Sequence, residues 1–581
     1  MEREWMTVMM ETPLIMRHLF EYSQIYYPQK EIVTRTPDGE FRYTYRDFGE
    51  RTRRLSSALA KLGVERGDRV GTFAWNHHRH LEAYFAIPCM GAVLHTINIR
   101  LSPEHITYIV NHAEDKVLLV DEGLLPLLEP LADQLQSVKA FIIMGEGGVQ
   151  LDGEDAAGSG AGEGGAGGKG RIGAGGSESG ASDRARNTPL QPAYSYEALL
   201  TEGDPAFSYP DDLEENAPMG MCYTSATTGN PKGVVYSHRG IYLHTMATGL
   251  ANTMALSESD VIMPIVPMFH ANAWGLPFAA VWFGAKMVLP GPAPSPSALL
   301  SLIAKEGVTV AAGVPTVWLG LLQEVETHPE QKLALRTVLC GGSAAPPALI
   351  QAYEQHGIPF QHAYGMTETS PLATFARLQT YQTALSPEEQ LSIRATQGML
   401  VPGLEVRVVK DDEDDEDVAW DGREMGELLL RGPWIADGYY NDERSQDAFR
   451  DGWLHTGDVA TIDEEGFVRL VDRTKDLVKS GGEWISSVDL ENALMAHPAV
   501  FEAAVVGVPH PKWDERPLAF VVFKPGQSAA KEELLNSLRS RFAKWWIPDD
   551  ILIIDEIPKT SVGKFMKRTL REEYQGHYAG V

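Results

Sequence analysis

The residues with the most evident chemical capacity lie in the stretch 223–233, YTSATTGNPKG. Four hydroxyl side chains occur within five positions and are followed by two glycines and a lysine. Successive backbone N–H groups in a tight loop form a concavity that binds anions, and hydroxyl and ammonium groups add further donors. The stretch therefore favours a loop that holds polyphosphate, and a Ser/Thr-rich surface turn is the alternative. A strand-like run at 234–236 follows, so the loop lies between two elements.

A separate stretch, from Gly145 to Gly180, is far richer in glycine than the hydroxyl-rich loop, because 16 of its 36 residues are glycine. Such a segment cannot bury enough apolar surface to offset the entropy lost on ordering it. We expect 145–182 to be a flexible surface insertion without chemistry of its own. Its match to G-x-G-x-x-G at 160–165 follows from the abundance of glycine. The acidic run 411–417, DDEDDED, is expected to be a solvated loop, with a metal-binding patch as the less favoured alternative.

The overall composition excludes several classes of protein. The 581 residues carry a formal net charge of −29, which argues against a nucleic-acid-binding protein with a basic face. The three cysteines are far apart, so we expect no disulfide framework, no structural zinc site and a cytoplasmic location. The most apolar run, 308–322, contains Pro315 and is shorter than the ~20 residues of a membrane-spanning helix. No transmembrane segment is expected, and a peripheral membrane contact stays open.

The elements that must position these residues alternate between helix and strand. The first part of the chain predicts a helix at 44–62, a buried strand at 70–74, a helix at 78–90 and a short strand at 92–95. This β-α-β order indicates an α/β fold with helices packed on mostly parallel sheets. After a boundary near Arg473, the pattern predicts strands at 503–508, 518–523 and 551–554 and a helix at 531–542, which suffice for a small α+β domain.

Five further segments follow the hydroxyl-rich loop along the chain. They are QHAYGMTET at 361–369, GEL at 426–428 with RG at 431–432, LHTGD at 454–458, DRTKD at 472–476 and PKTSVGK at 558–564. Together with 223–233, and in this order, they resemble motifs of the adenylate-forming (acyl-activating, AMP-binding) superfamily. That superfamily includes acyl-CoA synthetases, peptide-synthetase adenylation domains and firefly luciferase. One departure is Ala226, where many members have a glycine that leaves the loop backbone freer.

This resemblance implies a division of the chain and a reaction. It implies a large multi-sheet N-terminal adenylation domain at 1–471, a hinge at 472–477 that turns on Asp472, and a mobile α+β domain at 478–581. The implied reaction joins a carboxylate to the α-phosphate of ATP with release of pyrophosphate, after which the thiol of CoA attacks the acyl-adenylate. ATP, Mg²⁺ and CoA are therefore the expected cofactor and co-substrates.

The resemblance also implies roles for individual residues. Glu368 and Thr224 are the expected Mg²⁺ ligands, because Mg²⁺ prefers hard oxygen donors. Lys564 is the expected catalytic cation, since its long stem can bring an ammonium group between the carboxylate and the α-phosphate. Asp458 is expected to accept hydrogen bonds from the ribose hydroxyls, and Tyr364 offers a flat face for adenine. The remaining expected nucleotide contacts are Ser225, Thr227, Thr228, Gly229, Lys232, Gly342, His362, Ala363, Gly365, Thr367, Arg473, Lys475, Lys479 and Trp484.

The segment PMFHANAW at 267–274 bears on the identity of the carboxylate. Peptide-synthetase domains usually place an Asp directly after this Phe to pair with an amino-acid ammonium group, and this chain has His270 there. An amino-acid substrate is therefore disfavoured, and His270 is counted with Lys564 and Glu368 among the catalytic residues. The apolar run 275–283 suits an alkyl chain, although ordinary core packing would also explain it.

Within the superfamily, 267–274 and 479–492 most resemble bacterial medium- and long-chain fatty-acyl-CoA synthetases. In that subgroup the tryptophan matching Trp274 resembles a gate over the acyl tunnel, so Trp274 and Ala271 are expected at the acyl chain and Gly481 and Gly482 at the CoA arm. Some relatives of this kind activate short thioether acids, so the acid stays open. The subgroup is often dimeric through its N-terminal segment, here 5–19.

Two other functions remain as alternatives. One is an adenylating enzyme whose acceptor is a carrier protein or oxygen instead of CoA. The other is a nucleotide-sensing protein without activity, which is disfavoured because Lys564 and Glu368 are both intact.

Overall fold

The structure is a computed structural model that describes residues 9–145, 188–224, 229–410, 416–481, 483–559 and 564–579. Several expected features therefore lie outside the described residues. These are the glycine-rich insertion beyond Gly145, most of the acidic run, and the expected site residues Ser225, Thr227, Thr228 and Gly482.

A seven-stranded sheet in the order β7-β6-β5-β3-β4-β8-β9 contains the first half of the fold. All neighbours are parallel except β8 and β9, which form an antiparallel hairpin. The hydroxyl-rich loop connects these two strands. The strands are β3 (Arg69–Phe73), β4 (Val93–Thr96), β5 (Asp115–Asp121), β6 (Ala140–Met144), β7 (Ala193–Ser195), β8 (Pro218–Tyr223) and β9 (Gly233–Ser237).

A nine-stranded sheet in the order β16-β15-β14-β13-β12-β10-β11-β1-β2 lies beside it. Its six central strands are parallel, and β12 and β13 are buried throughout, as expected for strands covered on both faces. The strands are β1 (Glu31–Thr36), β2 (Gly39–Thr44), β10 (Val261–Pro264), β11 (Lys286–Leu289), β12 (Val310–Gly313), β13 (Thr337–Cys340), β14 (Phe360–Gly365), β15 (Leu372–Phe375) and β16 (Met399–Leu400).

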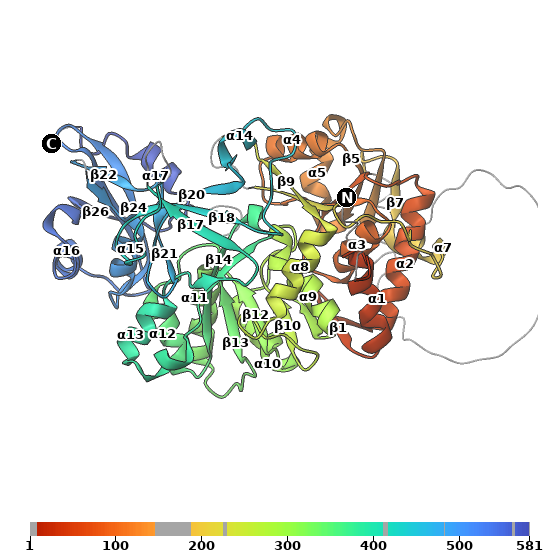
Figure 1. Ribbon diagram of the computed structural model, residues 1–581, viewed down its shortest axis with the longest axis horizontal. Coiled ribbons are helices and arrows are strands. Elements are labelled where there is room, and N and C mark those ends of the chain that lie inside the picture. The colour runs from red at the N-terminus through yellow and green to blue at the C-terminus, as the bar shows by residue number, and fades with distance from the viewer. Residues whose placement is uncertain are drawn as a thin grey trace, which may run out of the picture.

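Two smaller sheets follow, so the α/β class with several sheets is confirmed. One comprises β17 (Glu405–Val409), β18 (Gly426–Arg431), β19 (Phe449–Arg450), β20 (Trp453–Ile462) and β21 (Val468–Arg473). The other comprises β22 (Val478–Ser480), β23 (Glu483–Ile485), β24 (Val500–His510), β25 (Asp514–Phe523) and β26 (Asp550–Ile553). The last sheet and its helices gather at one end of the molecule, opposite α1 and α2 (Figure 1).

The helices cover the faces of these sheets (Figure 1). They are α1 (Met16–Tyr26), α2 (Tyr45–Lys61), α3 (His78–Cys89), α4 (Pro103–Ala113), α5 (Leu125–Leu128), α7 (Tyr196–Glu202), α8 (His238–Gly249), α9 (Leu276–Phe283), α10 (Pro296–Glu306), α11 (Pro315–Thr327), α12 (Pro347–Gln355), α13 (Pro387–Arg394), α14 (Ser445–Ala448), α15 (Ser487–Met495), α16 (Lys531–Arg539) and α17 (Lys567–Glu573). The predicted start of α2 is confirmed, because Thr44 and Asp47 form a reciprocal capping box. No helix in the described parts of the chain is long and apolar enough to cross a membrane.

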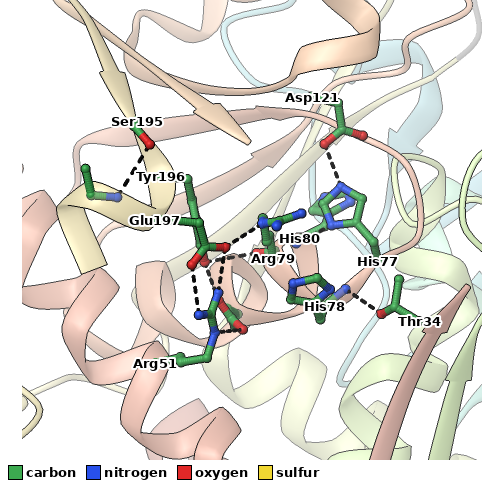
Figure 2. A network of polar contacts seen from close by, with 12 residues as sticks. Thr34, Arg51, His77, His78, Arg79, His80, Asp121, Ser195, Tyr196 and Glu197 are labelled. Carbon is green, nitrogen blue, oxygen red and sulfur yellow. Dashed lines mark hydrogen bonds and ion pairs between the residues drawn. The ribbon is translucent and has the colours of Figure 1, made fainter. Parts of the chain in front are cut away.

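A network of buried charges fixes α7 against α2 and α3 (Figure 2). The Glu82 carboxylate is fully buried and accepts hydrogen bonds from the Arg51 guanidinium, at 2.7 Å, and from the Tyr196 hydroxyl, at 2.5 Å. Glu197 completes the network through ion pairs with Arg51 and Arg79. These ion pairs connect α7 to α2 and α3, and the fully buried Glu82 carboxylate has two hydrogen-bond partners.

Candidate active site

The parallel strands bring the predicted motifs together at their carboxyl ends. In the nine-stranded sheet, His270 and Trp274 follow β10, Gly342 follows β13, and Glu368 follows β14. In the seven-stranded sheet, Thr224 follows β8. Since carboxyl ends of parallel strands share one edge of a sheet, this arrangement creates the place where α/β folds bind ligands.

The two described ends of the hydroxyl-rich loop are hydrogen-bonded to each other. The Thr224 N–H donates to the Lys232 carbonyl at 2.9 Å, and the Lys232 N–H donates to Thr224 Oγ1 at 3.2 Å. Gly229 has a φ of +69°, in the left-handed region that favours glycine. The loop therefore closes tightly at its base, as the composition predicts.

Lys232 is connected to Glu368 through a residue that sequence reasoning missed. The Lys232 ammonium donates to the Tyr439 hydroxyl at 2.8 Å, and that hydroxyl donates to Glu368 Oε1 at 2.7 Å. The ammonium also lies 4.0 Å from the centroid of the Tyr439 ring. The only signal in the sequence is a Gly-Tyr-Tyr triplet at 438–440, a few residues beyond the Arg431-Gly432 segment.

Glu368 is buried, with 4% of its surface exposed, in a short turn after β14. Gly365 makes the turn possible, because a Cβ there would lie 1.6 Å from the Pro371 carbonyl oxygen. Thr367 is also buried, and its carbonyl accepts a hydrogen bond from the Tyr236 hydroxyl at 2.9 Å. Lys232 is hydrogen-bonded to the Thr224 hydroxyl directly and to the Glu368 carboxylate through Tyr439. Both groups are hard oxygen donors, so they fit Mg²⁺ whose other ligands are phosphate oxygens and water.

Asp458 lies where β20 pairs with β21, opposite Arg473. Its carboxylate accepts a hydrogen bond from the Tyr364 hydroxyl at 2.6 Å and pairs with Arg473 Nε at 3.3 Å. The nearby Asp458 charge raises the pKa of Arg473. A carboxylate has room for about four hydrogen bonds, so Asp458 keeps capacity for two ribose hydroxyls.

His362 and Ala363, on β14, were expected to contact the nucleotide, but the side chains of both residues are buried. His362 is 2% exposed, and its Nδ1–H donates to the Thr396 carbonyl at 2.9 Å, away from the strand end. Ala363 is 6% exposed. Contacts of these two residues with a nucleotide would therefore come from the backbone.

Lys564 lies among the segments expected to hold the nucleotide, although it comes from the far end of the chain. Its Cε is 3.5 Å from the position that a Cβ on Gly342 would occupy. Burial, and then the Arg473 charge, lower the pKa of Lys564 to about 8, although the Asp458 and Glu368 charges act in the opposite direction. The ammonium group is therefore within electrostatic reach of the ribose side and of the expected metal ligand.

The Trp274 ring, which is expected at the acyl chain, lies close to the same point. It lies 3.2 Å from the position of a Cβ on Gly341 and 3.8 Å from that on Gly342. Ala271, which is 4% exposed, begins the turn that carries the ring. Burial, and then the Lys564 charge, lower the pKa of His270 to about 3, so its imidazole is neutral at physiological pH. Position 270 therefore carries no charge that would disfavour an uncharged acyl chain beside it.

Helix α9 continues from this turn with an apolar surface. Its buried residues are Leu276, Pro277, Phe278, Ala279, Ala280 and Val281. The apolar neighbourhood that the sequence predicts is thus directly attached to Trp274. The absence of an acidic residue at position 270 removes the expected counter-ion of an amino-acid substrate.

The other residues expected at the nucleotide or at CoA, which are Lys475, Lys479, Gly481 and Trp484, lie in the C-terminal part of the chain. Burial and the Arg473 charge lower the pKa of Lys475. Lys479 and Trp484 face each other across the β22–β23 hairpin, with Nζ 5.5 Å from the ring centroid, and 38% of Trp484 is exposed. Gly481, with a φ of +62°, forms the tip of this hairpin and donates its N–H to the Trp513 carbonyl at 2.8 Å. These contacts do not join the hairpin to Asp458 or Tyr364.

Asp472, the expected hinge residue, is hydrogen-bonded to the C-terminal part. Its Oδ2 accepts from the Ser487 N–H at 2.9 Å and from the Ser487 hydroxyl. That hydroxyl accepts a hydrogen bond from the Lys567 ammonium at 2.6 Å, and Lys567 pairs with buried Glu491 at 2.8 Å. A buried polar chain thus connects Asp472 to helix α17, which begins shortly after Lys564.

Comparison with known proteins agrees with this geometry. Residues 20–440 match the family described as AMP-binding enzyme, and residues 489–564 match the AMP-binding enzyme C-terminal domain. A long-chain-fatty-acid–CoA ligase of Thermus thermophilus is 48% identical over 99% of this chain and 98% of its own length. A 3-methylmercaptopropionyl-CoA ligase of Ruegeria lacuscaerulensis is 42% identical over 98% and 99%, and a medium-chain-fatty-acid–CoA ligase of Ectopseudomonas oleovorans is 41% identical over 97% of each chain.

Among solved structures, an anthranilate CoA ligase in complex with anthranoyl-AMP superposes with a TM-score of 0.81 at 26% identity, over 98% of this chain and 99% of that one. The residues that match the two families include the hydroxyl-rich loop, Glu368 and Lys564. The chain therefore belongs to the AMP-binding enzyme family and is an adenylate-forming acid–thiol ligase.

Proposed function

We propose that this enzyme is a medium- or long-chain fatty acid–CoA ligase that uses ATP and Mg²⁺. The single observation that carries the proposal is that Lys564 and the Trp274 ring both lie close to Gly342, which supports a site where we expect the nucleotide and the acyl chain to meet. The apolar helix α9, the neutral His270 and the fatty-acid relatives at 41–48% identity favour a fatty acid.

In the proposed first step, an oxygen of the fatty acid carboxylate attacks the α-phosphorus of ATP. The bond from the α-phosphorus to the bridging oxygen breaks, and pyrophosphate leaves. Two anions must approach each other, so fixed positive charge lowers the barrier where negative charge accumulates. We assign this role to Lys564, with Lys232 and the backbone of the hydroxyl-rich loop holding the leaving pyrophosphate.

Glu368 and Thr224 are the proposed protein ligands of Mg²⁺, which when bound neutralises charge on the phosphate oxygens. Asp458 holds the ribose, and Arg473 pairs with that carboxylate and orients it. Tyr364 fixes the other side of Asp458 and leaves its own ring face toward the base.

In the proposed second step, the thiolate of CoA attacks the acyl carbonyl and AMP leaves. We infer that 478–581 moves as a unit about a hinge at 472–477, which withdraws Lys564 and brings the Gly481-Gly482 turn to the thiol. A glycine at φ +62° allows close approach of a pantetheine arm to the backbone.

A second candidate substrate is a short thioether acid. The Ruegeria relative at 42% identity, named for such a substrate, favours it. The two candidates differ in the length of apolar tunnel that they require. A carrier protein or another acceptor in place of CoA is a further alternative for the second step.

The proposed setting is the cytoplasm, since all three cysteines are unpaired and buried. The proposed assembly is a homodimer through the N-terminal segment. Analytical ultracentrifugation of the full chain, compared with a variant lacking residues 1–15, tests the assembly directly.

The substrate is tested by incubating the protein with ATP, Mg²⁺, CoA and acids from C4 to C18, with 3-(methylthio)propionate included. We expect AMP and acyl-CoA, with the highest kcat/KM for acids of medium or long chain. Highest activity on the thioether acid would replace the fatty acid by the second candidate. Pyrophosphate exchange without thioester formation would indicate a different acceptor, and no turnover with any acid would reject the proposal.

A further inference from the structure

The turn that carries Trp274 has an unfavourable backbone. Residues 271–275 all have positive φ, from +42° at Ala271 to +77° at Gly275, and only the last is glycine. Consecutive left-handed residues with side chains are disfavoured, so they persist only when the surroundings fix them. Something must therefore hold the backbone that leads into this turn.

The Asn76 side chain, in the loop after β3 of the seven-stranded sheet, forms hydrogen bonds with this backbone. Its carboxamide Nδ2 donates to the carbonyls of Pro264, at 2.9 Å, and Val266, at 2.8 Å. Its Oδ1 accepts the Met268 N–H at 2.7 Å. Asn76 is 3% exposed, so one buried side chain makes three hydrogen bonds to the segment between β10 and His270.

Asn76 is itself held in place by its neighbours. Asp121 accepts a hydrogen bond from the Trp75 N–H at 2.8 Å. It also accepts one from His77 Nε2 at 2.6 Å (Figure 2). The His80 ring bonds to the Trp75 carbonyl at 2.9 Å and to the Thr72 hydroxyl at 2.9 Å. The loop after β3 is thus rigid on both sides of Asn76.

A second contact secures the same segment. The Tyr84 hydroxyl, from α3, donates to the Met268 carbonyl and lies 3.5 Å from Asn272 Oδ1. The Trp75 ring packs edge-on against Phe269, with centroids 5.9 Å apart. The loop after β3 and helix α3 therefore contact the chain at several points from Pro264 to Asn272.

We propose that Asn76 is a positioning residue for the acyl site: by clamping 264–268 it sets where Trp274 stands and hence which acyl chains fit. This inference rests on the proposed function for the identity of the acid. It assigns Asn76 no contact with substrate. Because the clamp touches the acyl side and not the segments around Asp458 or Glu368, its loss should affect the acid and spare ATP.

The test is Asn76→Asp, which keeps the acceptor for Met268 N–H but places a carboxylate against two carbonyl oxygens. We measure pyrophosphate exchange with the series of acids from C4 to C18. The expected result is a fall of about tenfold or more in kcat/KM for the preferred acid, with a shifted chain-length profile and a KM for ATP within about twofold of wild type.

Asn111→Asp is the matched control. The Asn111 side chain also bridges backbone groups of one loop, donating to the Gln134 carbonyl at 2.8 Å and accepting the Ser137 N–H at 3.4 Å, but it belongs to α4 and does not contact 264–274. Its chain-length profile should match wild type. Tyr84→Phe removes only the hydroxyl, and we expect the same shift in profile as for Asn76→Asp, at smaller size.

Two outcomes would overturn the inference. One is an unchanged chain-length profile in folded Asn76→Asp, as judged by circular dichroism. The other is an equal loss for ATP and for every acid, which indicates a general structural role. If Asn76→Asp does not fold, Tyr84→Phe decides alone, and an unchanged profile there counts against the clamp. Failure of the wild-type chain to use any acid would reject the proposed function instead.

Discussion

Among single residues, the central feature is the partly buried ammonium group of Lys564. Lys564 lies beside Gly342, far away in the sequence, and the charges of Asp458 and Glu368 act on it. Desolvation disfavours the charged form of a lysine and so lowers its pKa. An anion that binds beside it stabilises the charged form again. The residue is thus suited to a reaction in which negative charge grows at one point.

Lys564→Ala should separate the two half-reactions. We expect adenylate formation, measured by pyrophosphate exchange, to fall by about 10³-fold because an electrostatic contribution is lost from the transition state. Thioester formation from supplied acyl-adenylate and CoA should stay within about threefold of wild type. Equal losses in both steps would contradict the proposed withdrawal of Lys564.

The pKa of Lys564 predicts a pH dependence. The cationic form is required, and in the free enzyme it is lost as pH rises through about 8. The kcat/KM of adenylate formation should therefore be level below pH 7 and fall above pH 8, approaching tenfold per pH unit. In Lys564→Arg, which stays charged, the remaining activity should lack this fall. A wild-type profile that keeps rising to pH 9.5 would argue against the assignment.

Tyr439 connects Lys232 to Glu368, so its hydroxyl should orient both groups toward the phosphates. For Tyr439→Phe we expect about a tenfold rise in KM for ATP, a higher Mg²⁺ requirement and little change in KM for the acid. Tyr440→Phe is the control, because that neighbouring ring packs beside His112 instead, with centroids 5.5 Å apart. Similar kinetics in the two variants would remove Tyr439 from the site.

At the scale of elements, the position of Lys564 depends on how α17 is anchored. Lys567 begins α17 and pairs with buried Glu491 at 2.8 Å. Burial raises the pKa of Glu491 to about 7, and Lys567 opposes that rise. The helix is thereby fixed to α15, on the same polar chain that ends at Asp472.

Lys567→Met should leave the Glu491 carboxyl buried without its partner, and we expect a loss of about 3 kcal/mol in stability with reduced adenylate formation. The double variant Lys567→Met/Glu491→Leu should recover most of that loss, since it removes both charges. Urea unfolding followed by circular dichroism measures the first quantity, and pyrophosphate exchange the second. A double variant no better than the single one would show that the pair is not the anchor.

At the scale of the whole molecule, the question is whether 478–581 moves during the cycle. The three native cysteines are buried, so cysteines introduced at exposed positions can be labelled selectively. We expect fluorescence energy transfer between labels at Glu388→Cys on α13 and Glu532→Cys on α16 to change when CoA is added to enzyme preloaded with acid and ATP. ATP alone should leave it nearly unchanged, and a constant signal through turnover would contradict the movement.

Much of this molecule could be predicted from local patterns. The capping box at Thr44 and Asp47, the predicted helix at 78–90, realised as α3, and the strands β24 and β25 follow from residue types at short spacing. The expected site residues could be named because each lies in a compact motif. Tyr439 and Asn76 could not be named in this way, because each acts through hydrogen bonds to residues distant in sequence.

Local motifs were enough to identify the family and the α/β class and to name the residues expected at ATP, since the backbone and side-chain chemistry of such motifs is local. Which of these groups lie close together could be learned from the fold alone. The fold places Lys564 close to Gly342, joins Lys232 to Glu368 through Tyr439, and brings Asn76, after β3, to the backbone of 264–268, after β10. The physical reason is that parallel strands gather their carboxyl ends at common edges, so contacts between distant loops follow from sheet order and not from spacing along the chain.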